Sequence, residues 1–288
     1  MVALHALRPA VSSIVRNPVL VLVTSLYGLF QLPNLLVEST SPVLASAISL
    51  VTFGALVFAL PFFQGGVLGM ADEAVAGKTR LGTLIATGKT NYVPLLLGYF
   101  VLLAMNMVFG FVVFMGVIIV VVGGSIAGID GGTASGTGVD ASAVGFDPTL
   151  LAVLGIVAVG LVLAYLFVTF FVQFYAHAVV LDDAELVDGF RRSVGLVRSN
   201  LLGAFGYTVL LTVGSVLVGV VAAAGSLVFG PQQPAGSPIA GAVSIEPTAA
   251  VVAAVAIGYV LLTGVAGAFY ATYSVAFYRS VRPATDSA

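Results

Sequence analysis

The chain has 288 residues, of which 60% are hydrophobic and only 8% are charged. Soluble domains carry about 25% charged residues, so this chain cannot cover a surface that faces water. Several apolar runs are long enough to cross a membrane, and lipid is therefore the expected solvent for most of the chain. This composition excludes a soluble enzyme, a nucleic-acid-binding protein and a disordered protein.

The remaining composition restricts the chemistry. The chain has no cysteine, which excludes disulfides, thiolate metal sites and thiol nucleophiles. Its formal charge of −2 creates no field that would attract polyanions. Only Lys78 and Lys89 are lysines among the ten basic residues. This preference for Arg has two explanations that stay open, a salt-loving source and high-GC codon usage.

Six apolar runs follow one another along the chain. They cover residues 18–36, 43–70, 93–122, 148–181, 201–230 and 247–278. A membrane span needs about 20 apolar residues, so every run except the first has length to spare. No run carries an Asp, Glu, Lys or Arg in its central portion. The runs predict an all-α fold, an integral membrane six-helix bundle that forms one transmembrane domain over residues 1–288.

The basic residues lie only in alternate connections between these runs. They precede the first run, separate the second from the third and the fourth from the fifth, and follow the sixth. Because cytoplasmic loops collect Lys and Arg, we expect a multi-pass protein of the cell membrane with both termini in the cytoplasm. A cleavable signal peptide is the alternative for the first run. The nearest small-residue triplet, at 45–47, falls inside the second run, which argues against cleavage.

The connection at residues 123–147 differs in composition from the runs. It is rich in Gly, Ser, Thr and Ala, and it carries Asp130 and Asp140. Such a composition predicts a mobile, solvated external loop. A calcium site is the alternative, but the alternating Asp and Asn residues with a closing Glu that such a site needs are not present.

Three cytoplasmic segments lead into the next run in a similar way. Each places a basic residue one or two positions before an asparagine: Arg16 before Asn17, Lys89 before Asn91, and Arg198 before Asn200. We expect each asparagine to cap the N-terminus of the following helix, and each basic residue to hold the entry at the inner lipid interface. The chain would then contain three helical hairpins in parallel orientation.

An amphipathic stretch precedes each of these entries. Leu4, Leu7, Val11, Ile14 and Val15 share one helical face in the first stretch. The third stretch repeats the pattern from Leu186 to Leu201, whereas Gly82 and Gly88 interrupt the second. We infer short interfacial helices on the inner membrane surface. An ordinary helical loop beside a span is the alternative.

Candidate functional residues are few. His177 and Gln173 lie four residues apart near the cytoplasmic end of the fourth run and are candidates for a ligand or proton site. Hydrogen bonding to a neighbouring helix or headgroup is the alternative. The expected anchors at the inner interface are Arg16, Lys89, Arg191, Arg192 and Arg198. We expect no catalytic residue, metal or cofactor.

Carboxylates follow the second and fourth runs in similar places. Asp72 and Glu73 follow one, and Asp182 and Asp183 follow the other. A metal site would need additional rigidly held ligands, so we expect ion pairs instead. The expected partners are Lys78, Arg80, Arg191 and Arg192.

Small and amide side chains in the runs predict close helix packing. The small pairs are Gly65 with Gly69, Gly219 with Ala223, and Ala254 with Gly258. Four amide side chains within or near the runs, Gln31, Asn34, Gln64 and Asn106, are expected to form hydrogen bonds that join neighbouring helices.

Two stretches of the chain resemble a known group of proteins. They are residues 64–99, with Gln64-Gly65-Gly66 at the start and Lys89-Thr90-Asn91 near the end, and residues 190–200 with Phe190-Arg191-Arg192-Ser193. They resemble uncharacterised archaeal polytopic membrane proteins, many of them haloarchaeal, and more distantly the membrane domain attached to some glycerophosphodiester phosphodiesterases. The resemblance implies a helical membrane domain. It implies no catalytic residue, because the phosphodiesterase barrel with its His and acidic ligands is missing from this chain.

Two main hypotheses about function follow. The first is a non-enzymatic membrane protein that organises lipids or partner proteins, with membrane lipids as partners and a second copy or another membrane protein as a further partner. The alternative is a transporter or channel for a small or lipid-like substrate. An intramembrane enzyme ranks third because no reactive constellation is found in the sequence.

Overall fold

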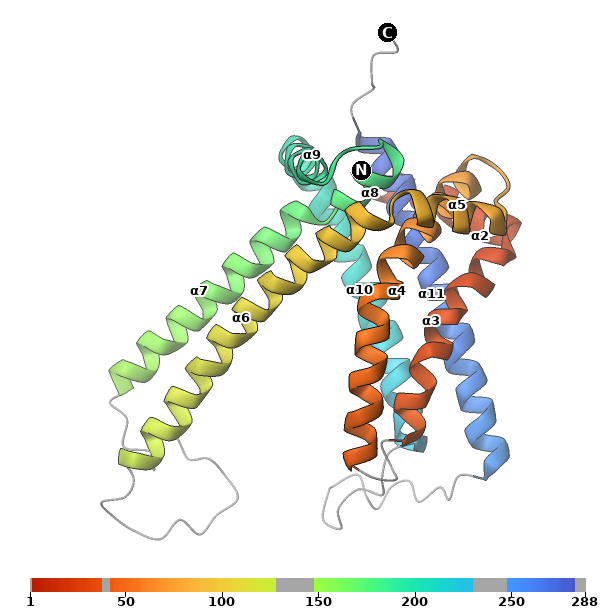
Figure 1. Cartoon of the computed structure of the whole chain (residues 1–288). Coiled ribbons are helices and arrows are strands. Elements are labelled where there is room, and N and C mark those ends of the chain that lie inside the picture. The colour runs from red at the N-terminus through yellow and green to blue at the C-terminus, as the bar shows by residue number, and fades with distance from the viewer. Residues whose placement is uncertain (1, 38–41, 128–147, 230–247, 283–288) are drawn as a thin grey trace. The chain divides into compact units, whose positions relative to one another are not determined.

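The computed structural model describes residues 2–37, 42–127, 148–229 and 248–282, and every regular element in these ranges is an α-helix (Figure 1). Most of the predicted external loop at 123–147 lies outside the described residues, together with its Asp130 and Asp140. Residues 123–127 belong instead to the end of a long helix.

Each of the six apolar runs corresponds to a long helix. These helices are α3 (Pro18–Val37), α4 (Pro42–Ala76), α6 (Tyr92–Ala127), α7 (Pro148–Val172), α10 (Leu201–Phe229) and α11 (Ala249–Val281). Five spans are long and apolar enough to cross a membrane, and α3 makes a sixth when it is counted with Ala3–Arg16, from which it bends by 90°. The prediction of an all-helical membrane protein is therefore confirmed.

The fourth run departs from the prediction of a single helix. A turn at Gln173 and Phe174 separates α7 from a short helix, α8 (Tyr175–Leu181). The second run forms one helix without a break. Helix α4 continues through Pro61 and ends six residues beyond Met70, the last residue of the predicted run.

Short helices precede three of the long ones. They are α2 (Leu7–Arg16), α5 (Leu81–Thr90) and α9 (Leu186–Ser199), which lead into α3, α6 and α10 through Asn17, Asn91 and Asn200 respectively. A single turn of helix, α1 (Val2–His5), precedes α2. Helices α2 and α9 are strongly amphipathic and α5 is less so, in agreement with the sequence. A threefold internal repeat stays a prediction.

The described residues form two compact units. Unit 1 comprises residues 1–97 and 174–288, and unit 2 comprises residues 98–173. That the whole chain acts as one domain stays a prediction.

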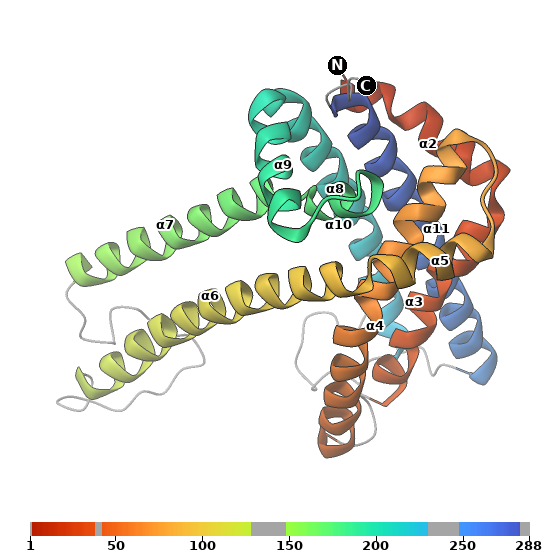
Figure 2. The same cartoon turned by 45° about the horizontal axis from the view of Figure 1, so that its top comes forward.

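In unit 1 the long helices α3, α4, α10 and α11 run side by side, and the most extensive contact joins α3 to α11. Helices α2, α5, α8 and α9 gather at one end of these long helices, which comes forward in Figure 2 and is here called the short-helix end. All ten Lys and Arg residues lie on these short helices or on the adjoining ends of the chain segments.

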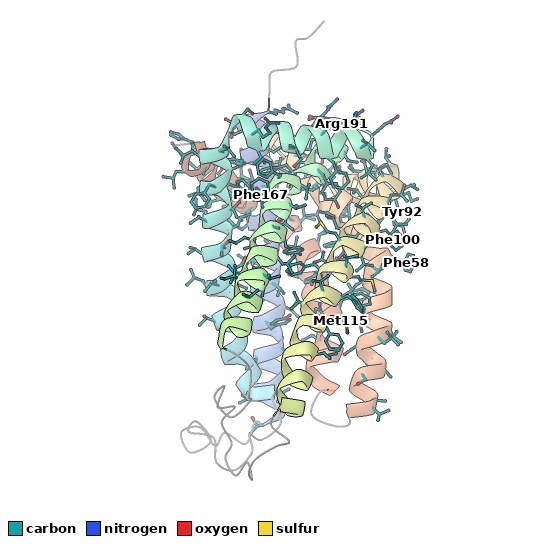
Figure 3. All side chains as sticks on the ribbon, turned by 90° about the vertical axis from the view of Figure 1, so that its left-hand side faces the viewer. Phe58, Tyr92, Phe100, Met115, Phe167 and Arg191 are labelled. Atoms are coloured by element: carbon teal, nitrogen blue, oxygen red, sulfur yellow. The ribbon has the colours of Figure 1, made fainter. Side chains whose placement is uncertain are left out.

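Unit 2 is a hairpin of α7 and the part of α6 after Leu97. The Tyr165 hydroxyl of α7 donates a hydrogen bond to Oδ1 of Asn106 at 2.5 Å, and the ring of Phe109 stacks on Tyr165 at 4.5 Å between centroids. The prediction that Asn106 joins two helices is therefore confirmed. Other side chains of this unit, such as Phe100, Met115 and Phe167, are hydrocarbon or thioether (Figure 3), as lipid contact requires.

Small residues let α5 pack closely on α4. A Cβ added at Gly69 would come within 2.6 Å of the Thr87 hydroxyl of α5, and one at Gly65 within 2.9 Å of Leu95 at the start of α6. The predicted pair of Gly65 and Gly69 therefore does mediate close packing. Gly219 and Gly258, which belong to the other two predicted pairs, do not mediate close helix packing, because a Cβ added at either would meet nothing within 4 Å.

Candidate functional site

The short-helix end carries the charged and hydrogen-bonding side chains, so the candidate site is built from it. Asn17, at the joint between α2 and α3, is 4% exposed. Its Nδ2 donates to the carbonyls of Ser13 at 2.9 Å and Gly77 at 3.0 Å, and its Oδ1 accepts from the Thr79 amide at 3.0 Å. This residue therefore ties α2 to the connection between α4 and α5.

The expectation that the three asparagines cap the following helices is wrong. Nδ2 of Asn91 donates back to the Thr87 carbonyl of α5 at 3.2 Å, and Nδ2 of Asn200 donates to the Ser199 hydroxyl at 3.0 Å. Each asparagine is the C-terminal cap residue of the short helix before it. The reason is that the chain turns at the joint, where the last carbonyls of the short helix need donors.

The C-terminal end of α11 pairs with acids from two other elements. Arg279 Nε lies 2.6 Å from Asp72 Oδ1 at the end of α4. One turn later, Arg282 lies 3.1 Å from Asp182 after α8, and the Tyr278 hydroxyl donates to the same carboxylate at 2.5 Å. These contacts join the C-terminal end of α11 to α4, which carries Asp72, and to the end of α8, which Asp182 follows.

The predicted ion pairs are partly correct. Arg192 lies 3.8 Å from Asp182, and Arg191 lies 3.5 Å from Asp188 on the exposed side of α9 (Figure 3). Lys78 and Arg80 form no ion pair with a described residue. The sequence did not indicate Arg279 and Arg282 as partners, since no local spacing relates α11 to Asp72 or Asp182.

Three of the predicted anchors are not ion-paired with any described residue. Arg16, Lys89 and Arg198 lie in the last turns of α2, α5 and α9. Among the described residues, Arg16 donates only to the Ser12 carbonyl of its own helix, at 3.2 Å. The other predicted anchors, Arg191 and Arg192, are paired with acids, so these two kinds of cation differ in their availability to an external anion.

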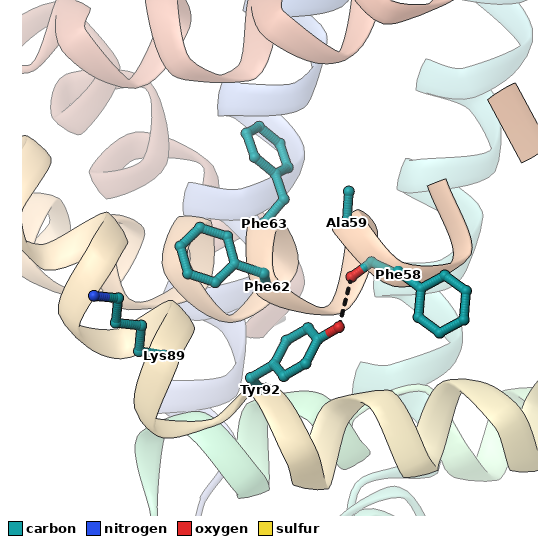
Figure 4. A pocket seen from close by; sticks show the side chains of 6 residues that line it. All are labelled: Phe58, Ala59, Phe62, Phe63, Lys89 and Tyr92. Carbon is teal, nitrogen blue, oxygen red and sulfur yellow. Dashed lines mark hydrogen bonds between the residues drawn. The ribbon is translucent and has the colours of Figure 1, made fainter. Parts of the chain in front are cut away.

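Lys89 also borders a pocket of about 540 Å³. The other lining residues are Phe58, Ala59, Phe62 and Phe63 of α4 and Tyr92 at the start of α6. Lys89 lies at one end of a row of aromatic side chains that ends at Phe58 (Figure 4). The pocket thus combines one cation with an almost wholly apolar wall.

Tyr92 fixes one side of this pocket. Its hydroxyl donates to the Phe58 carbonyl at 3.2 Å, three residues before Pro61 (Figure 4). A proline inside a helix disturbs the preceding turn of backbone hydrogen bonds, and donors from neighbouring elements can satisfy the carbonyls there. Gly88 allows α5 to pack closely against α4 beside the pocket, since a Cβ at this position would come within 2.8 Å of the Phe62 carbonyl.

Gln173 and His177 do not share one continuous helix, because the turn between α7 and α8 separates them. They also belong to different units. His177 is buried, with its ring stacked on Tyr278 at 5.4 Å and edge-on to Phe174 at 5.7 Å. Neither of its ring nitrogens has a hydrogen-bond partner in the described part of the chain.

The described ranges contain no group of three or more His, Asp or Glu residues that could hold a metal ion. Glu73, which the sequence predicted to form an ion pair, instead accepts hydrogen bonds from the Thr79 hydroxyl at 3.1 Å and the Thr83 hydroxyl at 2.7 Å. The exposed cations of this arrangement are suited to binding an anionic amphiphile at a surface.

Comparison with known proteins places the chain in a family without assigning an activity. No curated protein and no solved structure matches the chain. The distant likeness to the membrane domain of phosphodiesterases and the archaeal source therefore stay predictions. A family model described as a domain of unknown function, DUF7847, matches residues 1–281. The chain, with its surface helices and its apolar spans, therefore belongs to the DUF7847 family.

Proposed function

We propose that the protein is a non-enzymatic membrane module that organises anionic lipids in the inner leaflet of the cell membrane. The observation that carries this proposal is the Lys89 pocket, where an ammonium group without a described ion-pair partner borders an aromatic wall. A lipid phosphate would contact Lys89 while the first part of a lipid chain contacts Phe58 and Phe62.

The other unpaired cations support the same role. Arg16 and Arg198 hold places on α2 and α9 that correspond to the place of Lys89 on α5. A cation beside an anionic membrane surface contributes about 1 kcal/mol of attraction. Three such cations on three surface helices would gather anionic lipids around one end of unit 1. With that end in the cytoplasm, both termini are cytoplasmic.

The experiment compares Lys89→Gln with Lys78→Gln in protein reconstituted in nanodiscs that contain phosphatidylglycerol and phosphatidylcholine. Both substitutions remove one exposed ammonium at the short-helix end, but only Lys89 lines the pocket. Native mass spectrometry after release from the nanodiscs counts the retained phosphatidylglycerol molecules. We expect Lys89→Gln to lower the retained phosphatidylglycerol by about fivefold, which corresponds to about 1 kcal/mol.

Lys78→Gln should retain as much phosphatidylglycerol as the unsubstituted protein. Equal retention by the two variants, both low or both high, would contradict a specific role for the pocket. Tyr92→Phe provides a further check, because it keeps the aromatic wall and removes only the hydrogen bond to Phe58.

A transporter for a lipid-like substrate is the second candidate. It is supported by the apolar wall of the same pocket, which would suit a substrate taken from the bilayer. Transfer of a fluorescent phosphatidylglycerol between the leaflets of proteoliposomes, abolished by Lys89→Gln, would favour transport over organisation. Retention without transfer would favour organisation.

A further inference from the structure

A second, larger cavity lies in unit 1 away from Lys89. It is a groove of about 710 Å³ between α10 and α11, with contributions from α2 and from Tyr27 of α3. Its walls run from Leu210 to Gly219 on α10 and from Leu262 to Tyr270 on α11. None of its lining residues is charged.

The groove contains few polar groups that would need a partner from a ligand. The Thr263 hydroxyl, one of its few polar groups, donates to the Tyr259 carbonyl of its own helix at 2.8 Å. Two glycines of α10, Gly214 and Gly219, leave the space open, because a Cβ added at either would meet nothing within 4 Å. An apolar groove of this kind accepts hydrocarbon, since a polar ligand would lose its hydration without replacement.

The length of the groove matches one leaflet. From Leu210 to Gly219 the helix rises about 14 Å at 1.5 Å per residue. Half of the hydrocarbon core of a bilayer is about 15 Å thick. A lipid chain that lies along α10 and α11 would therefore fill the groove over its length.

The amphipathic helix α2 closes one end of this groove. Val11, Ile14 and Val15, three members of the apolar face predicted from the sequence, line it. Because α3 bends by 90° from this segment, α2 lies along the membrane surface when α3 crosses the membrane. Arg8 lies three residues before Val11, on the edge of the same helical face, and forms no ion pair with a described residue.

We infer that this groove holds one hydrocarbon chain of a membrane lipid whose anionic headgroup lies beside Arg8. The inference rests on the proposed lipid-organising function and adds a specific site to it. The apolar walls of the groove favour a hydrocarbon chain, and the length of the groove determines how deep that chain lies in the leaflet. The charge of Arg8 favours an anionic headgroup over a zwitterionic one.

The test fills the groove without disturbing the fold. Gly214→Leu places an apolar side chain in the groove, and Gly258→Leu places the same side chain at a position of α11 that is equally open but outside the groove. The probe is phosphatidylglycerol with a spin label near the end of one chain, and electron paramagnetic resonance in nanodiscs measures the immobilised fraction. Gly214→Leu should lower the affinity for the immobilised lipid by about tenfold, because each buried methylene group contributes to binding.

Gly258→Leu should keep the immobilised lipid. Arg8→Gln should reduce the preference for phosphatidylglycerol over spin-labelled phosphatidylcholine while keeping an immobilised chain. The inference is overturned if Gly214→Leu retains the immobilised lipid. It is also overturned if Gly214→Leu changes only the oligomeric mass in native mass spectrometry, which would identify a second copy as the occupant.

This outcome is distinguishable from failure of the proposed function. The Lys89 pocket shares no lining residue with the groove, so Lys89→Gln should leave the immobilised lipid unchanged. Loss of the immobilised spin label with Gly214→Leu, together with unchanged retention of phosphatidylglycerol by Lys89→Gln in native mass spectrometry, supports the groove alone. An unchanged immobilised fraction with Gly214→Leu, together with lower retained phosphatidylglycerol in Lys89→Gln, supports the Lys89 pocket alone and overturns the inference about the groove.

Discussion

Thr24 donates a hydrogen bond from its hydroxyl to the backbone carbonyl of Gly264 at 2.6 Å. The bond joins α3, the first long helix, to α11, the last, and Thr24 is buried. The Thr24 hydroxyl also donates to the Leu20 carbonyl of its own helix, so it is shared between the two helices. The two helices can approach this closely only because Gly264 has no side chain. The contact therefore joins the first and the last long helix of unit 1.

We expect Gly264→Ala to destabilise the protein. A Cβ at this position would clash with the Ser25 hydroxyl and come within 2.8 Å of the Val21 carbonyl, a backbone atom that cannot move alone. Overpacking of this kind costs about 1–3 kcal/mol. Circular dichroism during heating in detergent should show a lower midpoint of thermal unfolding.

Gly258→Ala is the matched control for this prediction. It lies on the same helix, and its new Cβ meets nothing within 4 Å. Because alanine favours the helix over glycine by about 1 kcal/mol, the midpoint should stay the same or rise. If both variants unfold at the same temperature, close approach of α3 and α11 at Gly264 does not stabilise the fold.

We expect Asn17→Ala to destabilise the short-helix end. The substitution removes three hydrogen bonds and leaves the Thr79 amide and the Gly77 carbonyl without this partner. Leaving a fully buried polar group unpaired costs about 1–3 kcal/mol, and because both groups are only partly buried the lower end of this range is expected for each. Limited proteolysis should therefore cut near residues 77–80 faster than in the unsubstituted protein.

Asn200→Ala tests whether the destabilisation by Asn17→Ala comes from the hydrogen bonds of Asn17 to residues 77–79 or from having an asparagine after a short helix. Asn200 occupies the same place after α9, but within the described ranges its side chain forms a hydrogen bond only with the Ser199 hydroxyl. A loss of about 0.5 kcal/mol or less is expected. Equal sensitivity of the two asparagines would show that the pattern, and not the tie to residues 77–79, determines stability.

We expect His177→Phe to preserve or raise stability. The phenyl ring keeps the stacking on Tyr278 and the edge contact with Phe174, and it removes two nitrogens that have no described partner. His177→Ala should lose about 3 kcal/mol or more, because it leaves a cavity in the aromatic cluster. Thermal unfolding compares the two. A strong loss of stability in His177→Phe would mean that the imidazole nitrogens bind a group that the aromatic packing does not provide.

The absence of cysteine makes the orientation directly measurable. A membrane-impermeant maleimide should label Ser199→Cys only after intact cells are permeabilised, because the distribution of positive charges predicts a cytoplasmic location for the short-helix end. Ser237→Cys, in a connection that the sequence places outside, should be labelled in intact cells. Labelling of Ser199→Cys from outside would reverse the orientation and the leaflet proposed for the lipids.

Much of the fold could be predicted from the sequence because its signals are local. Apolar runs of 20 or more residues define spans whatever their neighbours are, and the 3.6-residue period defines the apolar faces of α2 and α9. The position of the basic residues likewise needs only the order of runs and connections. The break after α7 was missed, since no Pro or Gly at Gln173 or Phe174 indicates it.

The candidate site was less predictable because its contacts join residues far apart in the chain. Asp72 pairs with Arg279 across 207 positions, and Asn17 reaches Thr79 across 62. Among many glycines, only packing distinguishes Gly264, which contacts α3, from Gly258, which meets open space.

The sequence by itself determined that this chain crosses a membrane, which segments do so, and where its charge lies, because transfer from water to lipid depends on composition along each segment. The tertiary structure alone decided which cations are neutralised by acids, which glycines lie at close contacts, and where Lys89 and the α10–α11 groove face open space. These features depend on distances between elements, and distance between elements is a property of packing that no single segment encodes.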